Sequence, residues 1–225
     1  MMEHHDASGR ALWWHCLTEN EFGCSNYKIA CHVALHKNVL NVDFSGVEKG
    51  GICLRAMGPA RSDINLGQLA NGVYALTISA GEYKETGTLT VDKDHYKITI
   101  KERGIKFDAV MLNRLPADAV LGRVAYKKNS EDSLLLGVLI DSLKNAGGAV
   151  QKLLPGNYGH FVVNEQGRLV SSPDKKKYES MDRSYGYFVL LFPGDQGNLK
   201  KAIDIFMKDH SRKISVDIGD AFYAY

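Results

Sequence analysis

Long apolar runs are missing from this sequence. The longest, residues 134–140 and 185–193, fall far short of the roughly 20 apolar residues that a membrane-spanning helix needs. The net charge is also small: 28 Lys and Arg residues against 26 Asp and Glu residues give a formal charge of +2. This balance gives little long-range attraction for nucleic acid or for a membrane surface. Together the two absences predict a soluble protein with no transmembrane segment.

A secretory signal is missing from the first thirty residues, where the only strongly apolar segment is residues 11–14. Cysteine is confined to the first quarter of the chain, as an even number of residues that are candidates for disulfides. They are Cys16, Cys24, Cys31 and Cys53. The cysteines favour an oxidising location at the cell surface or in the periplasm, whereas the missing signal favours the cytoplasm, and the sequence leaves both open.

Metal and cofactor motifs are also lacking. The cysteines and the histidines near them carry atoms that zinc prefers as ligands, but no Cys-x-x-Cys pair occurs among them. Asp92 and Asp94 alternate as calcium ligands do, yet no glycine and glutamate follow at the spacing of a calcium loop. Residues 92–95 therefore predict a hairpin turn, and we expect no metal and no cofactor.

Catalytic constellations are missing too. Asp209, His210 and Ser211 have the residue types of a hydrolase triad, but consecutive positions at a helix end point about 100° apart and cannot form a relay. The sequence places no serine, cysteine or lysine beside a plausible base, and it places no pair of acids at one site. It therefore predicts a protein that is not an enzyme.

The first half of the chain has the pattern of short strands separated by turn residues. Asn71 and Gly72 are typical of a tight hairpin, and the apolar residues of 96–100 alternate with polar ones. About six such strands, at spacings near ten residues, predict an immunoglobulin-like antiparallel β-sandwich. We expect this domain over residues 29–103, after an N-terminal arm of residues 1–28 and before a linker of residues 104–117.

The second half, residues 118–225, changes period. Apolar residues recur at helical spacing after Ser130 and after Asn198, both of which are good helix caps. Strand patterns flank these two helices and give the order strand, helix, strand, strand, helix, strand. That order predicts a ferredoxin-like βαββαβ domain, so the whole chain is expected to be α+β.

The third predicted strand of this domain, residues 185–192, is apolar on both faces. A sheet covered by helices on one side only should not have such an apolar outer face, so something is expected to cover it. The sequence leaves three candidates open: the first domain, a protein partner or a nucleic acid.

The segment Arg183-Ser184-Tyr185-Gly186-Tyr187-Phe188-Val189 resembles the first ribonucleoprotein signature of RNA-recognition motifs, with Ser184 in place of a glycine. The resemblance implies that Tyr185 and Tyr187 stack on bases, with a basic loop and Arg183 near phosphates. The candidate binding residues are Tyr185, Tyr187, Arg183, Lys175, Lys176, Lys177 and, on the first strand, Arg123.

The sequence lacks catalytic and cofactor motifs, and its two predicted domains resemble those of adhesive proteins. Together these features predict a non-enzymatic binding or structural protein of a bacterial cell surface or periplasm. In this interpretation the two domains pack through the apolar sheet face. The partner stays unknown, with a protein as one candidate. Two alternatives are left open. One is single-stranded RNA binding through the same face, and the other is a role like that of a protease inhibitor or propeptide, using the C-terminal residues 221–225.

Overall fold

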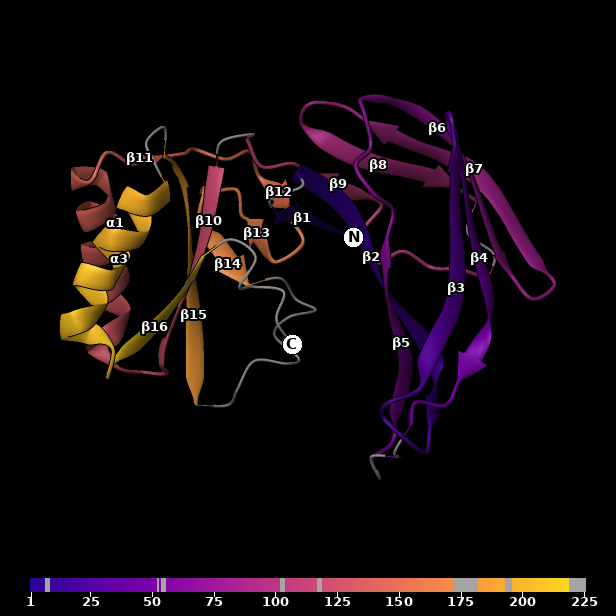
Figure 1. Cartoon of the computed structure of the whole chain (residues 1–225), viewed down its shortest axis with the longest axis horizontal. Helices are drawn as coiled ribbons and strands as arrows, with labels where there is room; N and C mark the ends of the chain where they lie inside the picture. Colours follow the sequence, from indigo (N-terminus) through magenta and orange to yellow (C-terminus); the bar gives the residue numbers. More distant parts are fainter. Residues whose placement is uncertain are drawn as a thin grey trace. The chain divides into compact units, whose positions relative to one another are not determined.

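The computed structural model of the chain describes residues 1–6, 9–51, 53, 56–101, 104–116, 119–171, 182–192 and 196–218. The chain divides into two compact units, Met1–Arg114 and Leu115–Tyr225, both visible in Figure 1. Most of the regular elements in both units are β-strands. Within the described residues, no helix is long and apolar enough to cross a membrane.

The first unit is a mixed sheet of nine strands in the order β1-β2-β5-β3-β4-β6-β7-β8-β9. The strands are β1 (Met2–Asp6), β2 (Gly9–Phe22), β3 (Lys28–His36), β4 (Val39–Glu48), β5 (Gly58–Asn65), β6 (Gly72–Ala80), β7 (Tyr83–Val91), β8 (His95–Ile100) and β9 (Met111–Asn113). Two neighbouring pairs, β3 with β5 and β4 with β6, are parallel. The segment expected to form an N-terminal arm thus supplies β1 and β2 to the sheet.

Strict alternation along the strands places one face of this sheet in the core. In β4, Leu40 and Val42 are fully buried while Asn41 and Asp43 are exposed. Strands from both ends of the sheet contribute to the same buried cluster, including Leu12 of β2 and Leu112 of β9. The prediction of an immunoglobulin-like β-sandwich is therefore wrong, because one curved sheet surrounds its own core and no second sheet packs against it in the described part of this unit.

Side chains bring the two ends of the nine-stranded sheet together. Glu3 of β1, only 6% exposed, accepts hydrogen bonds from the Tyr96 hydroxyl at 2.9 Å and from Arg114 Nε at 3.3 Å. Arg10 Nη1 lies 3.7 Å from the same carboxylate oxygen. Burial, together with the nearby Glu3 carboxylate, raises the pKa of Tyr96 and keeps its hydroxyl a donor. Since β1 and β9 do not pair through their backbones, this buried cluster joins the sheet ends.

The second unit is built around a four-stranded antiparallel sheet in the order β11-β15-β10-β16. Its strands are β10 (Ala119–Lys127), β11 (Ala149–Val150), β15 (Arg183–Leu191) and β16 (Ile214–Ile218). The 3₁₀ turn Glu131–Leu134 leads into α1 (Leu135–Asn145), and α1 packs beside α3 (Gln196–His210) on one face of the sheet (Figure 1). A second sheet contains β12 (Gly156–Asn157), β13 (Phe161–Val163) and β14 (Leu169–Ser171).

Both faces of the four-stranded sheet are buried inside this unit. On the helix side, Phe188 and Leu190 of β15 belong to a cluster with Leu139 and Ile203 of the two helices. On the other side, Leu121, Tyr187 and Val189 pack with residues of β12 to β14 and the segment before them, namely Leu153, Tyr158, Phe161 and Val163. The prediction of a six-element ferredoxin-like βαββαβ domain, and with it the α+β description of the chain, is therefore wrong. The additional small sheet makes the unit three-layered, and the chain as a whole is mostly β.

Candidate functional site

The expected RNA-binding face lies under the small sheet. Tyr187 is only 7% exposed, and its ring stacks on Phe161 with 5.7 Å between the ring centroids. The Arg123 guanidinium carbon lies 5.3 Å from the centroid of the Tyr185 ring, while Arg123 Nη2 donates to Asp217 Oδ2 at 2.8 Å. The structure thus brings three of the predicted residues together, but it engages them in contacts within their own unit. A base could stack on Tyr187 only by displacing Phe161.

The other predicted residues of this face are separate from that group. Arg183 is exposed at the beginning of β15. Residues 175–177, which carry the three lysines, lie outside the described residues. The C-terminal residues 221–225, which the inhibitor-like alternative uses, lie outside them as well.

The four cysteines form one disulfide and two free thiols. Cys24 is joined to Cys53, 29 positions further along the chain. Cys16 and Cys31 are free and half-buried, and burial raises the pKa of the Cys16 thiol to about 12. Because the thiolate is the reactive form of cysteine, Cys16 is a poor nucleophile and a poor metal ligand.

Strand β5 lies between the strands that carry the two free thiols. Ser62 of β5 is directly opposite Cys16 of β2, and its Oγ lies 3.9 Å from the Sγ of Cys31 in β3. Two strand spacings correspond to about 9 to 10 Å between backbones, beyond the roughly 7 Å that a disulfide can span. The fold therefore keeps these thiols apart.

We expect a thiol assay to find two reactive cysteines in the denatured, unreduced protein and four after reduction. A thiol reagent should modify Cys16 slowly in the native protein and quickly after denaturation, because its pKa is raised only while it is buried. Peptide mapping would identify the unmodified pair as Cys24 and Cys53. Four thiols before reduction, in protein purified without reductant, would contradict the assignment.

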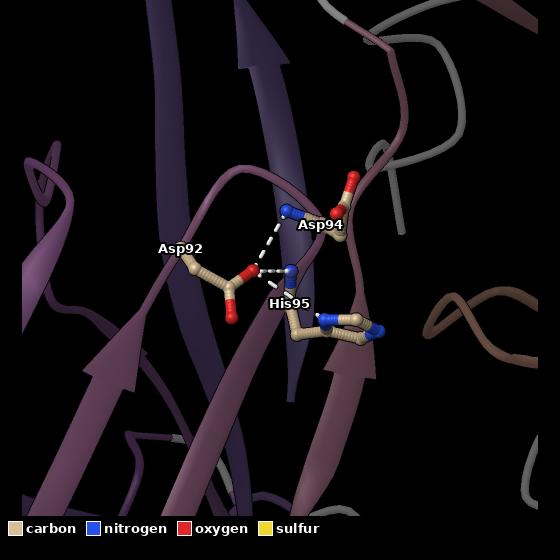
Figure 2. A group of neighbouring side chains, drawn as sticks. All are labelled: Asp92, Asp94 and His95. Carbon is tan, nitrogen blue, oxygen red and sulfur yellow. Dashed lines mark hydrogen bonds and ion pairs between the residues drawn. The ribbon is translucent and has the colours of Figure 1, made fainter.

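Three potential metal ligands gather at the turn between β7 and β8, where the predicted hairpin turn is present. Figure 2 shows Asp92 pointing at the backbone of the same turn, where its Oδ1 accepts from the amides of Asp94 at 2.8 Å and His95 at 2.7 Å. His95 Nδ1 lies 3.4 Å from the same oxygen. Although partial burial opposes the shift, these two amides lower the pKa of Asp92. The carboxylate therefore serves as the cap of the turn.

Two cationic residues contact this turn. Arg114 donates through its guanidinium to the carbonyl of Asp92 and through its backbone amide to the carbonyl of Asp94, the latter at 2.8 Å. Lys93 Nζ lies 3.6 Å from an Asp94 carboxylate oxygen. A divalent ion bound here would have to compete with Lys93 for Asp94 and with two backbone amides for Asp92, so the geometry favours a structural role that anchors Arg114.

The first unit exposes a different kind of surface where the disulfide joins two loops. The turn between β2 and β3 carries Cys24, and the connection between β4 and β5 carries Cys53. We call residues 22–27, from the last residue of β2 through the turn, together with Cys53 and Met57 of the other loop, the stapled tip. None of its residues belongs to the buried core of the sheet, so the disulfide holds the loops where a core does not.

Local packing within the stapled tip is close. The rings of Phe22 and Tyr27 stack with their centroids 5.0 Å apart. The backbone at Gly50 passes so near the other loop that a Cβ there would lie 2.3 Å from the Asn26 carbonyl oxygen, which only glycine avoids. These contacts and the disulfide fix the two loops against each other.

The stapled tip exposes an apolar side chain, and charged residues flank its two loops along the chain. Met57 is 72% exposed, more than any other large apolar side chain in the described part of the chain. Exposed residues of both charge signs flank the two loops along the chain: Glu21, Lys28, Glu48 and Lys49. An apolar centre with a charged rim is the usual anatomy of a protein-binding surface.

Sequence reasoning included the cysteines of this surface but missed its aromatic pair and Met57. The available signal was that Cys24 and Cys53 both lie beside turn residues, Gly23 and the pair Gly50 and Gly51. A disulfide between two turns predicts a fixed pair of loops at one end of a sheet.

Comparisons of the chain with models of protein families, with curated proteins and with solved structures find no match in any of the three.

Proposed function

We propose that this chain is a non-enzymatic binding protein that holds a protein partner at the stapled tip. The observation that carries the proposal is a disulfide that joins two loops outside the core, one of which exposes Met57. Loops held by a rigid β-scaffold are a common place for recognition, because they vary in shape without disturbing the core.

Fixing the loops before binding strengthens association. A loop that is already ordered loses less conformational entropy when a partner docks, so more of the contact energy appears as affinity. Methionine suits the centre of such a surface, because its unbranched, polarisable side chain adapts to an apolar pocket. The charged rim would then orient the partner and accelerate encounter.

The cysteine chemistry supports an oxidising location for this activity. A disulfide bridging exposed loops persists at a cell surface or in a periplasm, and the cytosol would keep it reduced. We therefore propose that the protein works outside the cytoplasm, as at a bacterial surface.

The test uses Met57→Asp, with Met111→Asp as the matched control. Met111 is also exposed, at 44%, and lies on β9, outside the stapled tip. Partners cross-linked to the tagged wild-type protein at the surface of the source cell would be identified, purified and titrated. We expect Met57→Asp to weaken binding by at least about 30-fold, because truncating or charging a central anchor costs 2 kcal/mol or more, while Met111→Asp leaves it unchanged.

Circular dichroism and thermal unfolding should show both variants folded, since both positions are exposed. Equal affinities of wild type and Met57→Asp for the identified partner would overturn the stapled tip as its binding site.

A further inference from the structure

The four-stranded sheet of the second unit ends at one side in a five-residue edge strand, β16. Strand β16 is the last in the sheet order, and it pairs with β10 on one side over five residues. On its other side no strand of the described residues pairs with it. A strand with one unpaired side presents backbone N–H and C=O groups that can pair with another chain.

Strand β16 lacks the devices that usually protect an edge. It contains no proline or lysine and no bulge, and at five residues it is much longer than the opposite edge strand β11 (Ala149–Val150). Its one charged residue, Asp217, accepts from Arg123 Nε at 3.1 Å and Nη2 at 2.8 Å. The ion pair offsets the charge that would otherwise repel an approaching strand.

The side chains of β16 are complementary to a second copy of β16 in one antiparallel register. Centring the pair on Val216 places Ile214 opposite Ile218 of the second copy and Ser215 opposite its Asp217, so apolar meets apolar and hydroxyl meets carboxylate. If one strand shifts by two positions relative to the other in one direction, Asp217 of one copy lies opposite Asp217 of the other. A shift by two positions in the opposite direction leaves only residues 214–216 paired. A slip by one position would set residues of opposite faces against each other.

We propose that two copies of this chain associate through antiparallel pairing of β16, so that the two four-stranded sheets become one sheet of eight strands around a twofold axis. Such an interface is isologous, because each copy contributes the same residues. Five paired residues bury a small area, so the association should be weak and concentration-dependent. This proposal does not depend on the stapled tip, which lies in the other unit.

Sedimentation analysis of the full chain over a wide concentration range tests the proposal. We expect the mass of the wild type to rise from 24.9 kDa toward twice that value. Ser215→Asp would face Asp217 of the second copy twice per dimer, and we expect it to raise the dissociation constant at least about tenfold. Ser215→Lys would face the same carboxylates with opposite charge and should associate at least as well as the wild type.

Ser133→Asp is the matched control, because Ser133 is exposed on the 3₁₀ turn of the same unit and should leave association unchanged. Hydrogen exchange of the wild type gives a readout that needs no variant. The β16 amides that point away from β10 should become protected as concentration rises. A wild type that stays monomeric at millimolar concentration, or a Ser215→Asp variant that associates like the wild type, would overturn the proposal.

Discussion

Replacing Glu3 with alanine should lower the free energy of unfolding by about 3 to 5 kcal/mol, the range observed when one partner of a buried ion pair is removed. Alanine leaves the guanidinium of Arg114, with a side chain only 11% exposed, without its carboxylate, and it removes the acceptor of the Tyr96 hydroxyl. It also frees the first strand from the far end of the sheet. Urea unfolding followed by circular dichroism would measure the loss.

Glu19→Ala is the matched control for this prediction. Glu19 also pairs with a cation, Lys106, at 2.6 Å, but both side chains are exposed, at 80% and 74%. Exposed pairs of this kind contribute about 0 to 1 kcal/mol, so Glu19→Ala should be nearly neutral. If Glu3→Ala is equally neutral, the buried cluster does not join the ends of the sheet.

Removing the disulfide with Cys24→Ser and Cys53→Ser should lower the free energy of unfolding by about 3 to 4 kcal/mol. This is the chain-entropy estimate for a cross-link that closes a loop of this length. Hydrogen exchange should increase most in residues 22–27, because no core contacts hold them. If the proposed function is right, affinity for the partner should fall as well, since the loops would no longer be fixed before binding.

Cys16→Ala with Cys31→Ala is the control for the disulfide variant, because it removes two half-buried thiols and leaves the disulfide in place. It should preserve the slow exchange of residues 22–27. A loss below about 1 kcal/mol in the double serine variant, with unchanged exchange in these residues, would mean that loop packing alone fixes the stapled tip.

Periodicity in the sequence located individual elements well. The apolar stripes after Ser130 and Asn198 correspond to α1 and α3, and the apolar segment at 185–192 corresponds to β15. Alternation shows that a strand has one buried face. It does not show whether that face packs on a second sheet or on the far wall of its own curved sheet, so it could not distinguish a sandwich from the nine-stranded sheet.

The additional small sheet was missed for a different reason. Strands β12, β13 and β14 have only two or three residues each, too few to establish a period. The sequence did predict that the apolar outer face of β15 is covered, and Tyr187 is indeed buried. It expected the cover from the first domain, a protein partner or a nucleic acid, whereas residues 153–163 of the same unit supply it.

The candidate site was only partly predictable. Four clustered cysteines indicated disulfide chemistry, but they allow several pairings, and sequence does not tell which thiols a strand will separate. The exposure of Met57 depends on its place just before β5, which pairs between β2 and β3. The position of β5 in the sheet has no local sequence signal.

The cluster around Glu3 also sets an order of events during synthesis. Its carboxylate and the guanidinium of Arg114 are 111 positions apart, so the first strand made cannot form its last contacts until the end of the unit has left the ribosome. Contacts this distant in sequence close slowly, because a long loop must be ordered first. Until then the edges of the sheet stay open to other chains. We therefore expect this unit to be most prone to aggregate during synthesis, before its last residues have been made.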